Sequence, residues 1–175
     1  VGMAIEQFEW YAEEAKRIYG HVLESRQPHG KVLIQHEPVG VVAAITPWNF
    51  PIAIPSWKLI PALVCGNTVV FKPASDTPLS AYRFVKIFEE AGLPPGVLNF
   101  VTGSGSEVGE PLIEHHSINL VSFTGSTDTG ATVAHKCAWN MKQYSLEMGG
   151  KNAIIVMDDA DLDPAVEGVV WGAFG

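Results

Sequence analysis

VGVVAAIT, residues 39–46, is a run of β-branched and small apolar residues that has no polar face. Such a strand is typical of the interior of a parallel sheet, where helices cover both sides. TVVF at residues 68–71 repeats the pattern, and a helical stretch at residues 56–64, interrupted by Pro61, separates the two strands. A strand, a helix and a second strand in this order predict a βαβ unit.

The same alternation extends over the rest of the chain. We expect helices at residues 4–25, 106–115 and 126–139, one that Asp76 or Thr77 caps and Gly92 ends, and a last one that begins at Asp163 and Pro164. Further strands are expected at residues 31–37, 97–101, 119–123, 144–147 and 153–156. The sequence therefore predicts an α/β fold, a Rossmann-like parallel sheet with helices on both faces.

Composition argues against several classes of function. The 175 residues carry 11 Lys+Arg and 19 Asp+Glu, a net charge of −8, which disfavours binding to nucleic acid or to an anionic membrane. The 47% hydrophobic content is too high for a disordered segment, and no apolar run reaches the roughly 18 residues of a membrane span. Two cysteines cannot build a disulfide framework, which favours a cytoplasmic protein.

Histidines and cysteines offer no obvious site. The six histidines lack metal-ligand spacing, so we expect no metal. His115 and His116 are expected to be solvated residues at a helix end, with rings that face different ways. Cys65 and Cys137 are expected to be structural thiols, because neither lies beside a His or at a helix start.

Both ends of the chain indicate a piece of a longer protein. The chain begins at Val1 without an initiator Met or a signal-peptide core, and it stops at Gly175 without a cap or a polar tail. We expect residues 1–175 to be one domain of a larger protein.

Polar or glycine-rich stretches follow the expected strands, at the edge of a parallel sheet where ligands bind. They are residues 46–49, 72–75, 102–105, 124–127 and 147–150. A Gly-Ser-Thr turn that opens a helix offers free N–H groups and a hydroxyl to a phosphate. Structural explanations stay open, because the glycines between residues 103 and 109 do not form the six-residue dinucleotide fingerprint and Lys72 can be a solvated charge.

Asn49 and Glu147 are the most unusual polar residues. Asn49 lies in an apolar stretch flanked by prolines, where a carboxamide needs partners. Glu147 ends a strand in an apolar neighbourhood, where a raised pKa would suit a general base. A salt bridge within a loop is the alternative for Glu147.

Four motifs in this order resemble those of the aldehyde dehydrogenase superfamily. They are PWNFP at residues 47–51, GNTVV leading to KPA at residues 66–74, FTGST at residues 123–127 and LEMGGK at residues 146–151. The resemblance covers essentially the whole chain and implies that residues 1–175 are the dinucleotide-binding domain of a longer protein. It also implies that residues 20–38 belong to an oligomerisation arm of a homodimer or homotetramer, and that the catalytic domain with its Cys nucleophile is absent from this chain.

The resemblance implies NAD(P)-dependent oxidation of an aldehyde or semialdehyde to the carboxylic acid. In that reaction a cysteine thiolate attacks the small-molecule aldehyde, and the amide that matches Asn49 holds the oxyanion with a backbone N–H. The residue that matches Glu147 then activates the water that hydrolyses the thioester. Lys58 matches a buried lysine with a role in proton movement. Without the cysteine we expect the 175 residues alone to be inactive.

The resemblance also assigns a cofactor site for NAD or NADP. Lys72 matches the lysine that binds the adenosine ribose, and Ser126 matches the residue that meets the pyrophosphate. Ser75 stands where strictly NAD-dependent members often carry a glutamate that would repel a 2′-phosphate, so we expect NADP to be accepted or preferred. The expected cofactor-binding residues are Ile45, Thr46, Pro47, Trp48, Asn49, Lys72, Ser75, Gly105, Gly109, Phe123, Thr124, Gly125, Ser126, Glu147, Met148 and Gly149.

Two other functions stay open. One is a noncatalytic dinucleotide-binding or scaffold fragment, which would not need Asn49 and Glu147 together. The other is a relative that passes the thioester to coenzyme A, which would not need a hydrolytic base at Glu147.

Overall fold

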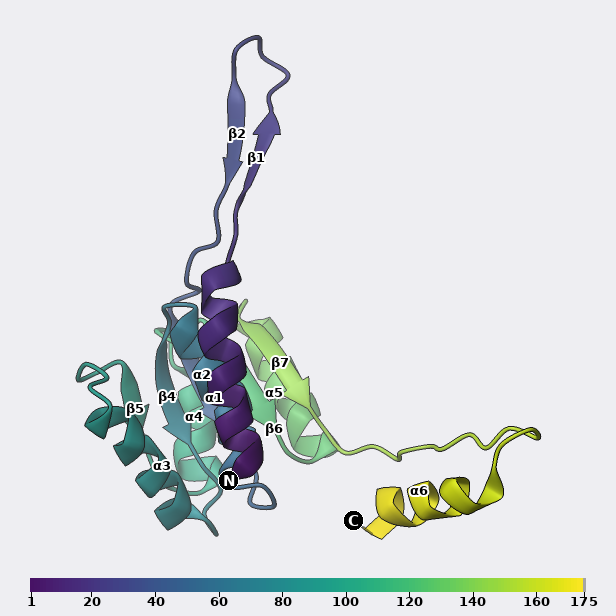
Figure 1. The fold of residues 1–175 in the computed structure, drawn as a ribbon. Coiled ribbons are helices and arrows are strands. Elements are labelled where there is room, and N and C mark those ends of the chain that lie inside the picture. Colours follow the sequence, from purple (N-terminus) through teal and green to yellow (C-terminus); the bar gives the residue numbers. More distant parts are fainter. Residues whose placement is uncertain (175) are drawn as a thin grey trace.

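The computed structural model describes residues 1–174 and contains a five-stranded parallel sheet, from which a hairpin and a C-terminal helix extend (Figure 1). The strands lie in the order β5 (Leu98–Phe100), β4 (Thr68–Lys72), β3 (Val41–Ile45), β6 (Leu120–Thr124) and β7 (Gln143–Glu147). The chain runs outward from β3 to β5 and then crosses back to β6. The carboxyl end of β3 therefore lies at the switch in strand order, where α/β sheets bind ligands.

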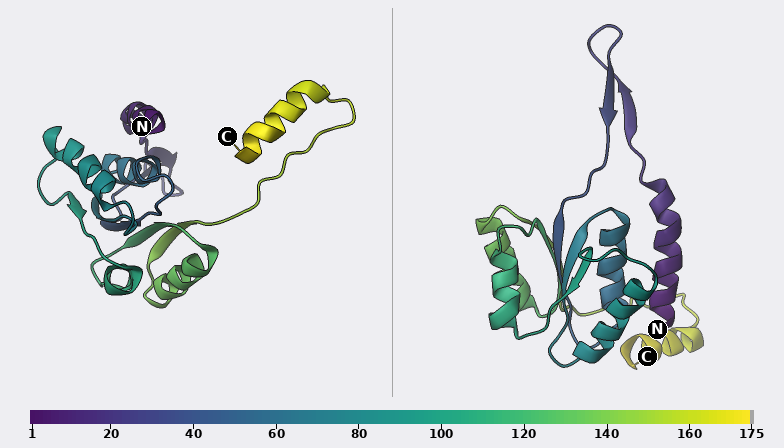
Figure 2. Two further views of the ribbon diagram at one scale, coloured as in Figure 1. Left: turned by 90° about the horizontal axis from the view of Figure 1, so that it is seen from below. Right: turned by 90° about the vertical axis from the view of Figure 1, so that its left-hand side faces the viewer.

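Helices cover both faces of this sheet, as Figure 2 shows from the side. α1 (Gly2–Glu14), α2 (Ala53–Val64) and α3 (Pro78–Glu90) lie on one face, and α4 (Glu110–Glu114) and α5 (Thr127–Trp139) lie on the other. In β3, Val42 and Ala44 join the first core, whereas Ala43 and Ile45 join the second. The predicted α/β fold, with a strand that is apolar on both sides, is confirmed.

The N-terminal helix is shorter than its sequence indicates. α1 ends at Glu14 and continues as a 3₁₀ turn (Ala15–Arg17), and β1 (His21–Glu24) pairs antiparallel with β2 (Lys31–Ile34). The chain closely approaches the end of β2 at Gly20, just before β1, since a Cβ there would lie 2.2 Å from the carbonyl oxygen of Ile34. The predicted helix over residues 4–25 is therefore wrong beyond residue 17, and the strand expected at residues 31–37 ends at Ile34.

Two other helices begin earlier than expected. α2 begins at Ala53, so Pro55 lies in the first turn, where its missing N–H costs no helical bond. The helix expected at residues 106–115 is a π turn, η2 (Gly105–Gly109), that continues into the five-residue α4. Thr77 occupies the N-cap position of α3, but its side chain makes no capping hydrogen bond.

The C-terminal part of the chain differs from the sequence-based prediction. The strand expected at residues 153–156 is wrong: this stretch leaves the edge strand β7 and pairs with no strand of residues 1–174. α6 (Leu162–Phe174) follows, lies apart from the sheet in Figure 1 and has no buried residue. Of the helices within residues 1–174, none combines the length and apolarity that crossing a membrane requires.

His115 and His116 also differ from expectation. Their rings stack with centroids 4.6 Å apart and planes 23° from parallel. The two residues follow the end of α4, so the angular separation of neighbours on a helix does not apply to them.

Gly40 immediately precedes β3 and allows a test of backbone strain at the start of the sheet. Its φ of +116° favours glycine, and a Cβ there would lie 2.4 Å from Oδ1 of Asn119, which accepts a hydrogen bond from the Val41 N–H. We expect Gly40→Ala to lower the free energy of unfolding by about 2 kcal/mol in urea titrations. Gly150→Ala is the control, because a Cβ at Gly150 meets nothing within 4 Å. Equal stability of the two variants would contradict the strain at Gly40.

Candidate functional site

A cavity of about 460 Å³ opens at the carboxyl edge of the sheet, between η2 and α4 on one side and α5 on the other. It is lined by five of the residues expected to bind a cofactor, which are Ile45, Lys72, Gly105, Gly109 and Phe123. These residues come from three neighbouring strands and from η2. The fold thus gathers at one cavity residues that are up to 78 positions apart in the sequence.

Lys72 places a buried amine at this cavity. Its Nζ donates a hydrogen bond to the Pro73 carbonyl oxygen at 3.0 Å, and burial lowers the pKa of Lys72. A Cβ at Gly109 would contact Cε of Lys72 at 3.7 Å, whereas a Cβ at Gly105 would meet nothing within 4 Å. The amine keeps further donors for a ligand, and the bare backbone of η2 leaves space beside it.

Ser75 lies beside this cavity and does not line it. Its hydroxyl donates to the Gly103 carbonyl oxygen at 3.2 Å and ties the loop after β4 to the loop after β5. Ser104 follows, accepting a hydrogen bond from the Glu107 N–H and donating one to the Glu107 carboxylate at 2.8 Å. The position after Lys72-Pro73-Ala74 is therefore neutral and hydrogen-bonded.

The N-terminus of α5 supplies a second group of donors. Ser126 is the N-cap residue and accepts a hydrogen bond from the Thr129 N–H at 3.3 Å, and the two hydroxyls also bond at 2.8 Å. The preceding Gly125 N–H donates to the Glu147 carbonyl oxygen and ties this turn to β7. Unpaired N–H groups and the helix dipole at such an end favour a phosphate.

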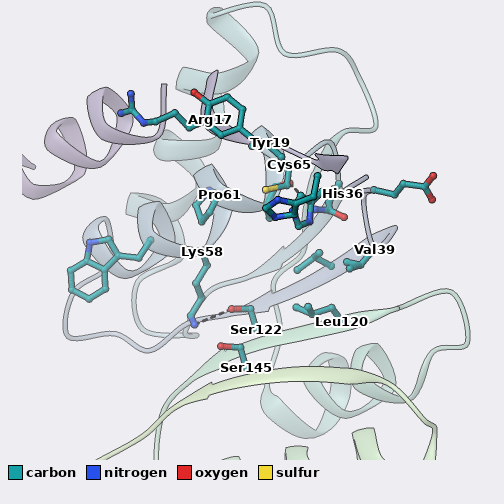
Figure 3. Close-up of a pocket in the computed structure, with 17 residues that line it drawn as sticks. Arg17, Tyr19, His36, Val39, Lys58, Pro61, Cys65, Leu120, Ser122 and Ser145 are labelled. Atoms are coloured by element: carbon teal, nitrogen blue, oxygen red, sulfur yellow. Dashed lines mark hydrogen bonds between the residues drawn. The ribbon is translucent and has the colours of Figure 1, made fainter. Parts of the chain in front are cut away.

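A second cavity of about 500 Å³ lies on the opposite face of the sheet, between α1, α2, β6 and β7. Lys58, Thr124, Glu147 and Met148 line it. Lys58 donates a hydrogen bond to the Ser122 hydroxyl at 3.1 Å, and Figure 3 shows Ser145 of β7 beside this pair. Burial lowers the pKa of Lys58 to about 8, and the Glu147 carboxylate opposes part of that shift.

Glu147 and the loop after β3 are open to solvent in this chain. Glu147 is exposed and forms no ion pair within residues 1–174, so the structure contains no loop salt bridge at this position. Trp48 and Asn49 are exposed and line neither cavity. The hydroxyl of Thr46 is buried and has no hydrogen-bond partner in the described chain.

Neither cysteine lies at these cavities. Cys137 is fully buried in the core beneath α5, and burial raises the pKa of its thiol. Cys65 is exposed and lines a third cavity of about 760 Å³, which also contains His36 (Figure 3).

The wall that α5 contributes to the first cavity was not predicted from the sequence. Asp128, Thr129, Thr132, Val133 and Lys136 line it together with Glu110 and Ile113 of α4. The α5 residues recur three and four positions apart, which is the spacing of one helical face, and that periodicity was the signal available in the sequence. On the second cavity, Gln7 and Tyr11 of α1 were likewise missed.

Comparisons with known proteins place the chain among aldehyde dehydrogenases. The model of the Aldehyde dehydrogenase family matches residues 1–175. The alpha-ketoglutaric semialdehyde dehydrogenase of Bacillus subtilis is 50% identical over 173 residues, which are 99% of this chain and 35% of that protein. The D-glyceraldehyde dehydrogenase (NADP(+)) of Thermoplasma acidophilum is 48% identical over 170 residues, which are 97% of this chain and 34% of that protein.

Solved structures show the same relationship. An aldehyde dehydrogenase from Brucella melitensis biovar abortus has a TM-score of 0.94 at 45% identity, covering 98% of this chain and 35% of its own. An NADP dependent enzyme of E. coli has a TM-score of 0.94 at 47% identity, covering 98% and 36%. The chain spans about a third of the length of the curated relatives it matches. By its sequence motifs, its fold and these matches, the chain belongs to the aldehyde dehydrogenase family.

Proposed function

We propose that this chain is the dinucleotide-binding part of an enzyme that oxidises an aldehyde or semialdehyde to the carboxylic acid with NAD or NADP. The observation that carries the proposal is the cavity at the carboxyl edge of the sheet. There the buried amine of Lys72 lies against the bare backbone of η2, and α5 forms the facing wall. The relative from Thermoplasma acidophilum is named as an NADP(+) enzyme, which supports this choice of cofactor.

The residues present fit a dinucleotide. Lys72 would donate to the ribose hydroxyls, and the Ser126 hydroxyl with the first N–H groups of α5 would bind the pyrophosphate. Ile45 and Phe123 form an apolar floor. The Thr46 hydroxyl, which has no hydrogen-bond partner among residues 1–174, leaves a donor at the same edge. When bound, the nicotinamide supplies a hydride acceptor.

We assign the steps of aldehyde oxidation to residues of the second cavity, on the other face of the sheet, and of the loop after β3. We assign the Asn49 amide to hydrogen bonding of the oxyanion and Glu147 to removal of a proton from water. Lys58 shares the second cavity with Glu147, and near pH 8 it can hold or release a proton beside the Ser122 hydroxyl. Because neither Cys65 nor Cys137 lines either cavity, we expect the 175 residues alone to bind dinucleotide without oxidising aldehydes.

The hairpin is the proposed oligomerisation arm. Every residue of β1 and β2 is exposed, and Val22, Leu23, Val32 and Leu33 present apolar side chains on strands that project away from the sheet (Figure 1). We propose that residues 20–38 pack against a second copy in a homodimer or homotetramer. The exposed free thiol of Cys65 supports a reducing, cytoplasmic compartment.

Ser75 tests the choice of cofactor. We expect Ser75→Glu to weaken NADP binding at least about tenfold and to leave NAD binding largely unchanged, because a carboxylate would repel the 2′-phosphate. Isothermal calorimetry with both dinucleotides measures this, with the exposed Ser117→Glu as the control for added charge. Wild-type protein that binds NAD tenfold more tightly than NADP would contradict our expectation that NADP is accepted or preferred.

Lys58 tests the electrostatics of the second cavity. Folding lowers its pKa from the ordinary 10.5 to about 8, so below pH 8 the folded chain buries a charge that the unfolded chain exposes to water. The Lys58 contribution to the free energy of unfolding should therefore rise by on the order of 2 kcal/mol between pH 8 and 10.5. Urea titrations of wild type and Lys58→Met should show this rise only in wild type. A parallel pH dependence of the two would refute it, and Lys86→Met, on an exposed part of α3, is the control.

Asn49 and Glu147 test the roles in turnover. In the complete enzyme, Asn49→Ala should lower kcat by about 10²–10³-fold because the oxyanion loses a donor. Glu147→Gln should preserve a rapid first burst of reduced cofactor and slow the steady state by about 10²-fold, because only hydrolysis needs the base. Stopped-flow absorbance separates the two. A Glu147→Gln variant with an unchanged steady state would overturn the assignment, and one that turns over only with coenzyme A would indicate the acyl-transferring class.

A further inference from the structure

Lys136 joins α5 to α4 across the first cavity. Its Nζ lies 2.6 Å from Oε2 of Glu110 and 2.7 Å from Oε1 of Glu114, and its side chain is only 21% exposed. Lys136 and Glu110 both line the cavity, from opposite walls. The charge network is therefore part of the site's boundary.

The short helix α4 depends on such contacts for its position. Five residues are too few for a stable isolated helix, and α4 follows the irregular η2 turn. Glu110 and Glu114 are four residues apart, so their carboxylates repel each other on one helical face. Within residues 1–174, Lys136 is the cation that pairs with either of them. Lys142 holds the other end of α4 through the carbonyl oxygens of Ile113 and His115.

The two walls that Lys136 links are suited to a flat apolar group. On the α5 wall, the Thr132 hydroxyl donates to the Asp128 carbonyl oxygen and the Thr129 hydroxyl bonds to Ser126, so both are already hydrogen-bonded within the helix. Val133 on this wall, with Gly109 and Ile113 on the other side, forms the apolar part of the slot, and Asp128 lines it at the N-terminal end of α5. A purine ring fits such a slot better than a sugar, which would need polar partners.

We propose that Lys136 is a positioning residue, which fixes the separation of α4 and α5 and thereby the opening of the slot for the adenine ring. This inference rests on the proposed dinucleotide function. Lys136 acts through Glu110 and Glu114 and not by contact with a phosphate, because its ammonium group already lies between two carboxylates.

The direction in which one double substitution changes dinucleotide affinity distinguishes positioning from direct attraction of the ligand. If Lys136 acts by positioning, Glu110→Gln with Glu114→Gln weakens dinucleotide binding, because the ion pairs that hold α4 are lost. If Lys136 instead attracts the ligand directly, removing the two carboxylates frees its charge and strengthens binding.

The test is calorimetry of the protein at its natural length with NADP, NAD and ADP-ribose. Lys136→Met should raise Kd for all three ligands about fivefold, the size expected when a partly exposed ion-pair network is lost. Lys136→Arg should restore most of the affinity. Adding Lys136→Met to the Glu110→Gln and Glu114→Gln variant should cost nothing further. Lys86→Met is the matched control, because Lys86 also forms an ion pair on a helix surface and lines neither proposed cavity.

The possible failures are distinct. Wild-type protein that binds neither dinucleotide overturns the proposed function itself. Wild-type protein that binds while Lys136→Met binds equally well overturns the positioning role alone, as does tighter binding by the Glu110→Gln and Glu114→Gln variant. Loss of affinity in Lys136→Met that Lys136→Arg does not recover also contradicts the ion-pair mechanism.

Discussion

Burial of both faces of β3 is the constraint on which the rest of the structure depends. Ala43 and Ala44 are completely inaccessible and point to opposite sides, so helices must cover the sheet twice. A strand buried in this way lies at the centre, beside both β4 and β6, and its carboxyl end becomes the switch in strand order. The cavity that carries Lys72 opens at that end, so the packing of two alanines and the position of the proposed cofactor site have one cause.

The sheet also separates two kinds of chemistry. Alternate residues of β6 serve different faces, because Phe123 lines the cavity beside α5 whereas Ser122 and Thr124 line the cavity beneath α1 and α2. Each face holds one buried lysine, Lys72 or Lys58, whose pKa burial lowers. In the proposed function, this one strand thus supports dinucleotide binding on one side of the sheet and proton movement on the other.

Local pattern predicted the parts of the fold that local forces decide. The apolar runs of β3 and β4 follow from their period, and the predicted helix over residues 126–139 agrees with α5 to within one residue. Pattern failed at β1, whose pairing with β2 overrides the helical signal before it. It also failed at residues 153–156, an apolar run that leaves the free edge of β7 unpaired. The ion pairs of Lys136 could not be predicted from local pattern, because its partners lie 22 and 26 residues away. The roles of Asn49 and Glu147 came from family motifs, since both are exposed in this chain and residue chemistry left their functions open.

A structure of this protein with NADP bound tests the central claim most directly, which is that the cavity at the carboxyl edge of the sheet holds the dinucleotide. Our account predicts the adenine ring between α4 and α5, the ribose beside Lys72 and the pyrophosphate at Ser126. NADP bound in the third cavity, beside His36 and Cys65, or on the face that contains Lys58, would contradict it.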